Sequence, residues 1–591
     1  MPNNDTPISI FSPQVIESMR DNGFKSTASA LAELIDNSIE AGANKIRVIT
    51  FEKKSSSRQG KAVDSIAIYD NGSGMSPEIM ECALQFGGGT KHNSVSGMGK
   101  FGMGLPNSSV SVCRKVTLFS WINNKCFSST LDIEEIVSTS NLILAKPVKC
   151  EIPKAVIKEL EEDIGDSGTI VIWEDCDRLD FKMAKTLFNR MQGDLCRIFR
   201  HFLDEDNDYG QQVEIKLIKP RGFQYVRDER ILEANDPLYI LSPNNCPGYE
   251  NENIAELQDE KVHRQEFFTS KGKGTVEVRV TIVKPEIHRA ESGRSSPFMK
   301  HLHKNTGVSF VRYCREIQHG GFGHLNSFDP RERWWGVEVR FPPVLDALFG
   351  VTNNKQTVKG MNLMGQDEIA EIISDLDLTG SDKDYLNSGP GQTLHLRMWL
   401  SKIITGCLKK ARNEINSRNT GKKVAKKDTE LDKASKAATE ILKKDKAKSR
   451  FDEEADAKTE EQARKELKDR LSGYNKGLDE KELDELVNQV ENYKIHTEVD
   501  SWSGDQFFDI ELCGATPVVK LNTRHPFYDS IYRDIEQNHP EALNAFKVLI
   551  ISYAWSESEF YADAETRLLD KVRSKWGYYT AEILDQLQAS K

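Results

Sequence analysis

The strongest constraint on the fold is an alternation of helix and strand patterns in the first 200 residues, interrupted by a stretch dense in glycine. Apolar residues recur at helical spacing over 13–22 and 26–41. The strand-like runs lie at 46–51, 65–70, 116–121 and 169–174. The glycine-dense stretch, 87–104, lies between the second and third of these runs. This pattern predicts an α/β domain over residues 1–205.

The rest of the 591 residues is long enough for further domains. An α+β domain is predicted over 206–378 from strand-like runs at 213–218, 276–283, 308–313 and 335–341. Residues 379–495 contain few large apolar side chains and predict a charged helical arm or linker. Two short strand-like runs followed by helices predict a small α/β module over 496–591. The predicted fold class is therefore α/β and α+β, multidomain.

The net charge of the whole chain differs from the net charge of its individual segments. The chain has 80 Lys and Arg against 91 Asp and Glu, a net charge of −11, which excludes an evenly basic surface. Residues 409–450 nevertheless hold 15 basic and 6 acidic residues, and 451–485 hold 7 and 13. Opposed blocks of this kind are typical of a solvated helix face. The basic block would equally suit contacts with DNA phosphates.

Several classes of protein are disfavoured by composition. No apolar run approaches the roughly 18 residues of a membrane span. The ten cysteines include no CxxC pair, which excludes zinc ribbons and thioredoxin-type redox sites. The first residues lack the pattern of a signal peptide. We therefore expect a cytoplasmic protein with no membrane association.

The first candidate catalytic residues lie in a helical segment at 32–43. Glu33 and Asn37 are four residues apart, so a helix places both side chains on one face. A carboxylate can act as a general base toward water, and an amide oxygen is a suitable ligand for Mg²⁺. Asp36 could accompany the metal or serve as a structural hydrogen-bond acceptor. Taken alone, the segment is also compatible with a solvated helix surface.

A second candidate segment, Asp70 to Met75, follows the strand-like run at 65–70. A carboxylate at a strand end can accept a hydrogen bond from an exocyclic amine. Gly72 and Gly74 would let the backbone approach a planar base closely. Taken alone, the segment is also typical of a tight Asp-Gly turn.

A glycine-rich loop and a threonine complete the set. The segment 96–109 places four glycines before a predicted helix, so that backbone N–H groups could converge on phosphate oxygens. The loop is neither a Walker A nor a Rossmann fingerprint. Thr169 opens the strand-like run at 169–174, where its hydroxyl could support Asp70, or could simply be part of a strand.

In this order and spacing the four segments resemble the ATP site of the GHKL superfamily, which includes gyrase B, the heat-shock chaperone, histidine kinases, MutL and MORC proteins. The resemblance covers roughly residues 10–200 and implies a Bergerat fold that binds ATP and Mg²⁺. It implies that Glu33 is the general base, that Asn37 binds Mg²⁺, and that Asp70 binds the adenine amine with Thr169 beside it. Gly72, Gly74 and Met75 would complete the base pocket. The lid over the phosphates would comprise Gly97, Gly99, Lys100, Phe101, Gly102, Met103 and Gly104.

A second resemblance links the next domain to this site. The segment 349–358 is similar to the NKQ element that follows the transducer strands of MORC proteins. Carried over, Lys355 would reach the terminal phosphate and stabilise charge in the transition state, with Gln356 beside it. ATP would then draw the two domains together. The spelling of the lid also favours a MORC-like protein, which we expect to be prokaryotic.

These resemblances predict an ATP hydrolase that acts as an ATP-gated, dimerising clamp. The client would be DNA, in DNA transactions or in defence against foreign DNA. The alternatives are a chaperone-like ATPase acting on protein clients, and a nucleotide-binding scaffold. A histidine kinase is disfavoured because no phosphoacceptor helix precedes the ATP segments.

Overall fold

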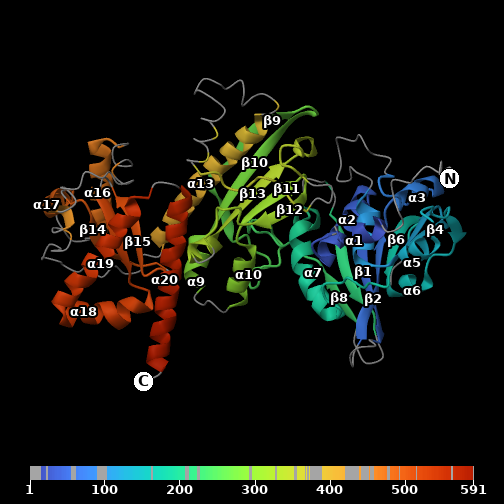
Figure 1. Cartoon of the computed structure of the whole chain (residues 1–591), viewed down its shortest axis with the longest axis horizontal. Helices are drawn as coiled ribbons and strands as arrows, with labels where there is room; N and C mark the ends of the chain where they lie inside the picture. Colours follow the sequence, from blue (N-terminus) through green and yellow to red (C-terminus); the bar gives the residue numbers. More distant parts are fainter. Residues whose placement is uncertain are drawn as a thin grey trace, which may run out of the picture.

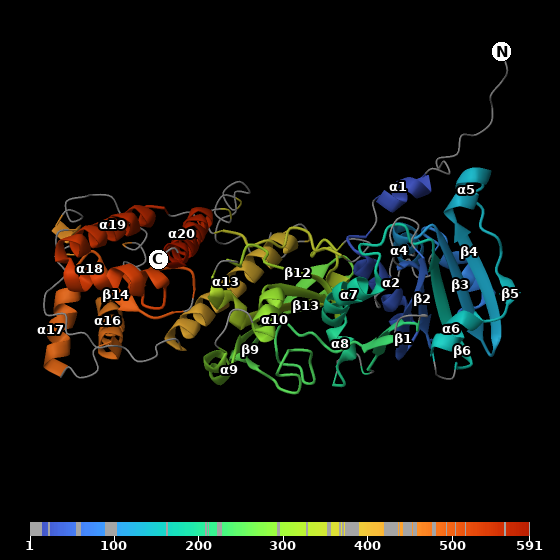
Figure 2. The same ribbon diagram turned by 90° about the horizontal axis from the view of Figure 1, so that it is seen from below.

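The computed structural model describes residues 15–21, 24–54, 61–88, 103–160, 164–206, 212–221, 227–291, 296–326, 329–351, 356–365, 391–418, 458–474, 480–491, 493–502, 504–513, 516–560 and 563–589, together with a few isolated residues between these ranges. These residues form three bodies in a row along the long axis of the molecule (Figures 1 and 2). Each body is built around one sheet, with eight, five and three strands in chain order.

The first sheet has the strand order β5-β4-β3-β6-β2-β1-β7-β8, in which only β1 and β7 are parallel neighbours. Its strands are β1 (Lys45–Lys54), β2 (Lys61–Asp70), β3 (Lys115–Ile122), β4 (Lys125–Asp132), β5 (Val148–Cys150), β6 (Ser167–Glu174), β7 (Glu214–Lys219) and β8 (Asp228–Ile231). Its helices are α1 (Val15–Asp21), α2 (Thr27–Glu40), α3 (Pro77–Ala83), α4 (Gly104–Val112), α5 (Ile133–Thr139), α6 (Lys154–Leu160), α7 (Ala184–Ile198) and α8 (Arg200–Leu203).

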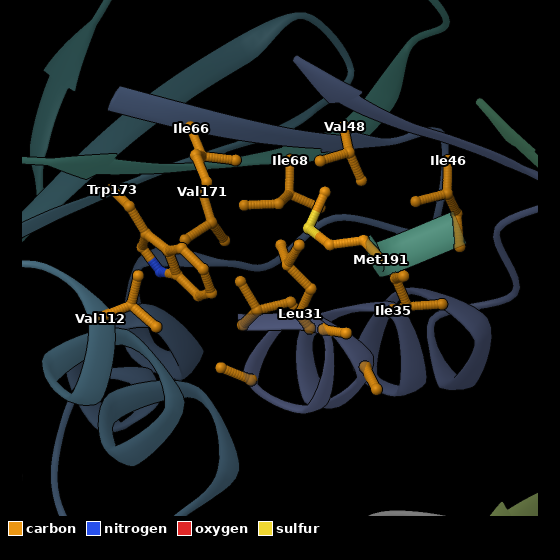
Figure 3. Packing of buried hydrophobic residues seen from close by; sticks show 14 of the residues in the cluster. Leu31, Ile35, Ile46, Val48, Ile66, Ile68, Val112, Val171, Trp173 and Met191 are labelled. Carbon is orange, nitrogen blue, oxygen red and sulfur yellow. The ribbon is translucent and has the colours of Figure 1, made fainter. Parts of the chain in front are cut away.

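The alternation of strand side chains divides the first domain into two cores. One face of the sheet packs against α2, α4 and α7 through Ile46, Val48, Ile66, Ile68, Val171 and Trp173 (Figure 3). The opposite face packs against α6 through Ile49, Ala67, Tyr69, Ile170 and Ile218. Because β2 alternates strictly, its last residue, Asp70, points to the same side as Ile66 and Ile68, toward α2. The end of this strand therefore carries a functional candidate onto the helical face.

The strand predicted at 213–218 belongs to the first sheet, which corrects its expected place beyond residue 206. It forms β7 and pairs in parallel with β1, Ile46 opposite Ile215. The side chains of Ile215 and Leu217 extend the apolar face that packs on the helices. Pairing between residues that are 169 positions apart in the sequence leaves no local pattern, so the sequence did not reveal it.

The second sheet has the order β12-β11-β13-β10-β9, with β11 and β13 parallel. Its strands are β9 (Ala255–Thr269), β10 (Gly272–Val283), β11 (Val308–Arg312), β12 (Arg315–Gly320) and β13 (Trp335–Phe341). Short helical elements accompany them, namely α9 (Pro285–Ala290), α10 (Pro297–Asn305) and the 3-10 helices η1 (Pro330–Trp334) and η2 (Pro343–Leu345).

Helix α13 (Gln392–Arg418) belongs to this second domain and not to an exposed arm. It contacts β9, β10 and β13 and buries a helical stripe of Leu396, Leu400, Ile404, Cys407, Leu408, Ala411 and Ile415. The stripe was hidden in the sequence because polar and charged residues outnumber it on the other faces of the helix. The expected arm at 379–495 therefore begins, in the described residues, as part of a packed core.

The C-terminal body has the strand order β14-β16-β15, covered by helices on both faces. Its elements are α16 (Glu460–Tyr474), α17 (Glu480–Val490), β14 (His496–Asp500), β15 (Phe508–Cys513), β16 (Thr516–Asn522), the π-helix η3 (Tyr528–Tyr532), α18 (Arg533–Asn538), α19 (Pro540–Ser558) and α20 (Asp563–Ala589). Val487 and Val490 of α17 pack on α16 and Val518, so the end of the expected arm is part of this core. Of the helices in the described ranges, none is long and apolar enough to cross a membrane.

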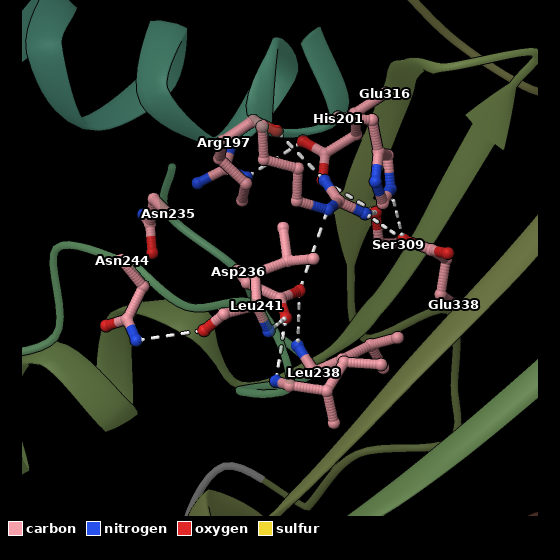
Figure 4. A network of polar contacts seen from close by, with 12 residues as sticks. Arg197, His201, Asn235, Asp236, Leu238, Leu241, Asn244, Ser309, Glu316 and Glu338 are labelled. Atoms are coloured by element: carbon pink, nitrogen blue, oxygen red, sulfur yellow. Dashed lines mark hydrogen bonds and ion pairs between the residues drawn. The ribbon is translucent and has the colours of Figure 1, made fainter. Parts of the chain in front are cut away.

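A buried network of charges joins the first two domains (Figure 4). Arg200 of α8 donates to Glu316 of β12 at 2.9 Å, to Glu338 of β13 at 2.5 Å and to Ser309 of β11 at 2.8 Å. The His201 ring lies 2.8 Å from Glu338. Burial acts to raise the pKa of both carboxyl groups, but Arg197 and Arg200 hold the pKa of Glu316 below its usual range. His201, together with Arg340 and Arg200, does the same for the pKa of Glu338. The two domains are thus held by charges that have no access to water.

Replacing Arg200 by Met, a side chain of similar length, leaves Glu316 and Glu338 buried without their central cation. We expect the free energy of unfolding to fall by about 3–5 kcal/mol. Urea denaturation followed by tryptophan fluorescence measures the change. Arg264→Met is the matched control, because the Arg264–Glu277 pair is largely exposed and is worth about 0–1 kcal/mol. Equal effects of the two substitutions would contradict the role given to the network.

Candidate active site

Glu33 lies on α2 in a buried position, with 2% of its surface exposed. Ser26 caps the start of the helix: its hydroxyl accepts from the N–H of Ser29, and Ser29 returns a bond to the N–H of Ser26. Gly104, the first residue of α4, faces the carboxylate. A Cβ at Gly104 would lie 2.9 Å from Oε2 of Glu33, so a side chain there would displace the candidate base. The cap and the glycine together fix where Glu33 lies.

Asn37 and Asp36 occupy the next turn of α2 in different surroundings. Asn37 is partly exposed and lies one turn beyond Glu33. Asp36 is fully buried, and its Oδ2 lies 3.0 Å from Nε of Arg315, a residue of the second domain. Of the two roles that the sequence leaves open for Asp36, the structure shows the hydrogen-bond acceptor.

Asp70, at the end of β2, has its carboxylate directed at α2. Oδ1 accepts from the N–H of Gly72 at 2.9 Å, and Oδ2 accepts from the hydroxyl of Ser38 at 2.9 Å. Burial raises the pKa of Asp70 from 3.8 to about 6, although both hydrogen bonds act to lower it. At a pH near 6 this carboxyl is therefore present in comparable amounts of its neutral and charged forms.

The remaining base-pocket candidates meet at Ser120 of β3. The N–H of Met75 donates to Oγ of Ser120 at 2.8 Å, and that oxygen lies 3.2 Å from Oγ1 of Thr169. Thr169 is the cross-strand neighbour of Asp70. Gly74 has a φ of +69°, and a Cβ there would lie 2.3 Å from the carbonyl oxygen of Trp121. Only glycine fits that position.

Part of the predicted site lies outside the described residues. These are Gly97, Gly99, Lys100, Phe101 and Gly102 of the glycine-rich loop, and Lys355. Met103 and Gly104, the last residues of that loop, lead directly into α4. Gln356, next to Lys355, is buried, and its Oε1 accepts from the N–H of Lys25 at 3.0 Å, just before the cap of α2.

Three residues at the site were missed by sequence reasoning. Ser38 follows Asn37 directly, and its hydroxyl contact with Asp70 could have been suspected from that adjacency. Ser120 lies inside a predicted strand, where a serine gives no signal. Arg315 is 279 residues from Asp36, and no local pattern connects them.

The comparisons with known proteins agree with this geometry. Residues 25–169 match the family described as histidine kinase-, DNA gyrase B- and HSP90-like ATPase. The first domain belongs to the GHKL superfamily. The chain is also 26% identical over 138 residues to Protein MICRORCHIDIA 5 of Arabidopsis thaliana, a match that covers 23% of this chain and 19% of that protein. A solved structure described as the N-terminal domain of a DNA repair protein aligns over 65% of this chain and 99% of its own length, with 16% identity and a TM-score of 0.32.

The donor set of the GHKL domain suits the groups that its family implies. Asn37 offers an amide oxygen beside the buried Glu33, and Mg²⁺ accepts one or two protein oxygens together with waters and phosphates. Asp70 offers an acceptor for an amine at the end of a strand, next to the close backbone approach at Gly72 and Gly74. These residues thus fit a metal-bound phosphate beside Glu33 and an amine-bearing base beside Asp70.

The raised pKa of Asp70 has a consequence for stability. The folded chain holds this proton more tightly than the unfolded chain, so Asp70 lowers stability progressively as the pH rises from about 4 past 6. In Asp70→Asn, the amide oxygen can still accept from Gly72. The amide nitrogen can donate to Oγ of Ser38, whose own proton reaches the Leu34 carbonyl. We expect the variant to gain up to about 3 kcal/mol at pH 8 and nothing below pH 4.

Urea denaturation of wild type and Asp70→Asn across pH 4–8 measures this difference. The wild-type protein at pH 4 is the internal control, because its carboxyl is then mostly neutral. A stability gain that grows on acidification would contradict the burial of a charge at this site.

Proposed function

We propose that this protein hydrolyses ATP with Glu33 as the general base and Asn37 as the Mg²⁺ ligand. The observation that supports it best is that α2 joins two buried carboxyl groups, because Glu33 lies on the helix beside Gly104 and Asp70, at the end of β2, accepts a hydrogen bond from Ser38 of the same helix. Glu33 takes a proton from water, the water oxygen forms a bond to the γ-phosphorus, and the bond to the bridging oxygen of ADP breaks. Asp70 accepts a hydrogen bond from the adenine amine, with Thr169 beside it.

Hydrolysis in this proposal depends on both domains. Gln356 of the second domain contacts Lys25, the residue before the cap of α2, which supports a link between that domain and the helix that carries Glu33. The role of the adjacent Lys355 at the terminal phosphate is part of the proposal. A lysine there would stabilise the negative charge that develops on the phosphate oxygens. Binding of ATP would therefore favour the arrangement in which the two domains are docked.

We propose further that ATP joins the N-terminal domains of two copies into a clamp, and that hydrolysis releases them. The proposed client is DNA, contacted by the basic block at 409–450. Within the described part of that block, Lys410 pairs with Asp259 at 2.7 Å and Arg412 pairs with Glu332 at 2.7 Å. Those cations are already engaged inside the second domain. The phosphate contacts are therefore assigned to the basic residues of the block after 418, all of which lie outside the described residues.

The turnover of ATP tests the catalytic assignment. We expect wild type to hydrolyse ATP slowly in Mg²⁺, and Glu33→Ala and Lys355→Ala to lose at least roughly 100-fold in kcat. Glu33→Ala should still bind ATP and accumulate as a dimer, which light scattering detects. Glu135→Ala, which removes an exposed carboxylate of α5, is the control and should keep wild-type turnover. Normal turnover by Glu33→Ala would refute the assignment.

The client is tested by reversing charge in the basic block. Replacing Lys422, Lys423, Lys426 and Lys427 by Glu should abolish salt-sensitive binding to duplex DNA, because these lysines would release counterions from phosphates. Fluorescence anisotropy at two salt concentrations measures the effect. The control carries four Lys→Glu changes at exposed positions of the first two domains, namely Lys149, Lys154, Lys271 and Lys273. Unchanged DNA binding in the first variant, or no binding in wild type, would favour the protein-client alternative.

A further inference from the structure

The hairpin formed by β11 and β12 extends from the second domain into the first. Its turn contains Tyr313, with a φ of +59°, and Cys314. Cys314 is 3% exposed and belongs to the hydrophobic core of the GHKL domain, whereas Phe310 and Ile317 of the same hairpin belong to the core of the second domain. The turn is thus an inserted element, and the next residue, Arg315, is delivered to the side of α2.

Arg315 contacts two carboxylates on α2. Its Nε lies 3.0 and 3.2 Å from the two oxygens of Asp36, and its Nη2 lies 3.8 Å from Oε1 of Glu33. All three side chains are buried, with 0–3% of their surface exposed. Because Glu33 and Asp36 are three residues apart on a helix, one guanidinium can span both.

We infer that Arg315 is a positioning residue for Glu33, and that it makes ATP turnover dependent on docking of the second domain. The inference rests on the proposed function, because it requires Glu33 to be the general base. The ion pair with Asp36 fixes the guanidinium, and the guanidinium then holds the Glu33 carboxylate against Gly104 and the start of α4. A small displacement of a general base costs much of its effect, so the loss of this contact should lower kcat.

The same hairpin provides a matched control. Arg312 is the cross-strand partner of Arg315 and is equally buried. It pairs instead with Asp346 of its own domain, at 2.6 and 3.0 Å. Loss of Arg312 therefore disturbs the hairpin and removes a buried ion pair without touching α2.

The experiment compares steady-state ATP turnover and ATP binding of the full chain carrying Arg315→Gln, Arg315→Lys or Arg312→Gln. We expect Arg315→Gln to lower kcat by roughly 10- to 100-fold, with the dissociation constant of ATP within about threefold of wild type. Arg315→Lys should recover part of the rate, because one ammonium keeps the charge but cannot span both carboxylates. Arg312→Gln should keep wild-type kcat.

A second comparison separates positioning from folding. Arg315→Gln alone leaves Asp36 buried without its cation and should lower the thermal midpoint. The double variant Asp36→Asn with Arg315→Gln replaces the ion pair by two amides that can bond to each other, and should recover the midpoint. Its kcat should remain low, because no cation faces Glu33. Recovery of kcat together with stability would show a structural role only and would overturn the inference.

Two other results would also overturn it. A higher kcat in Arg315→Gln would show that the guanidinium restrains Glu33, and equal losses in Arg312→Gln and Arg315→Gln would show a general effect of the hairpin. Failure of the proposed function has a different signature, namely no turnover by wild type or unchanged turnover by Glu33→Ala. Failure of the inference alone leaves wild type active, Glu33→Ala inactive and Arg315→Gln at the wild-type rate.

Discussion

The packing of α2 across the first sheet is the interaction on which the rest of the structure depends. Leu31 and Ile35 are completely buried against the sheet, and each contributes roughly 1.5–3 kcal/mol by leaving water. The helix is enclosed on its other sides as well, so that Glu33, Asp36 and Ser38 are also buried. A helix held so firmly by its apolar side can carry charged groups in a dry environment on the other. The burial of the candidate site residues therefore follows from the packing of this helix into the core.

Charges without access to water require partners, and those partners come from the second domain. Asp36 is paired by Arg315, and Arg200 of the first domain is paired by Glu316 and Glu338 of the second. These groups are paired only where the two domains are docked, and substitution of one partner leaves the other buried without a compensating charge. The docking of the two domains is thus coupled to the same helix that carries the candidate base. A change in the charge on α2 would therefore also alter the ion pair between Asp36 and Arg315 at the domain interface.

The sequence predicted those parts of the fold and the site that depend on local pattern. The strand runs at 46–51 and 65–70 are visible because apolar residues on them face two cores. Glu33 and Asp70 were predicted as site residues because the four segments together resemble the GHKL pattern, and the structure shows both side chains buried. The place of β7 was predicted wrongly, because its partner β1 is distant in the chain. The apolar stripe of α13 was diluted by charge. Arg315 could not be found at all, since only the inserted hairpin brings it to Asp36.

Asp70 shows why such a site is less stable than its surroundings. An amide at this position could make the same hydrogen bonds as Asp70 without burying a charge. The ionised carboxylate makes these bonds but is destabilised by its burial. A buried carboxylate is a stronger acceptor for an amine than an amide oxygen is, and it gains that strength because water is excluded. The same exclusion of water strengthens the contact between Arg315 and the two carboxylates of α2. The hydrogen bonds of Asp70 and the ion pairs that join α2 to the second domain thus depend on the same physical source, the low polarity around this helix.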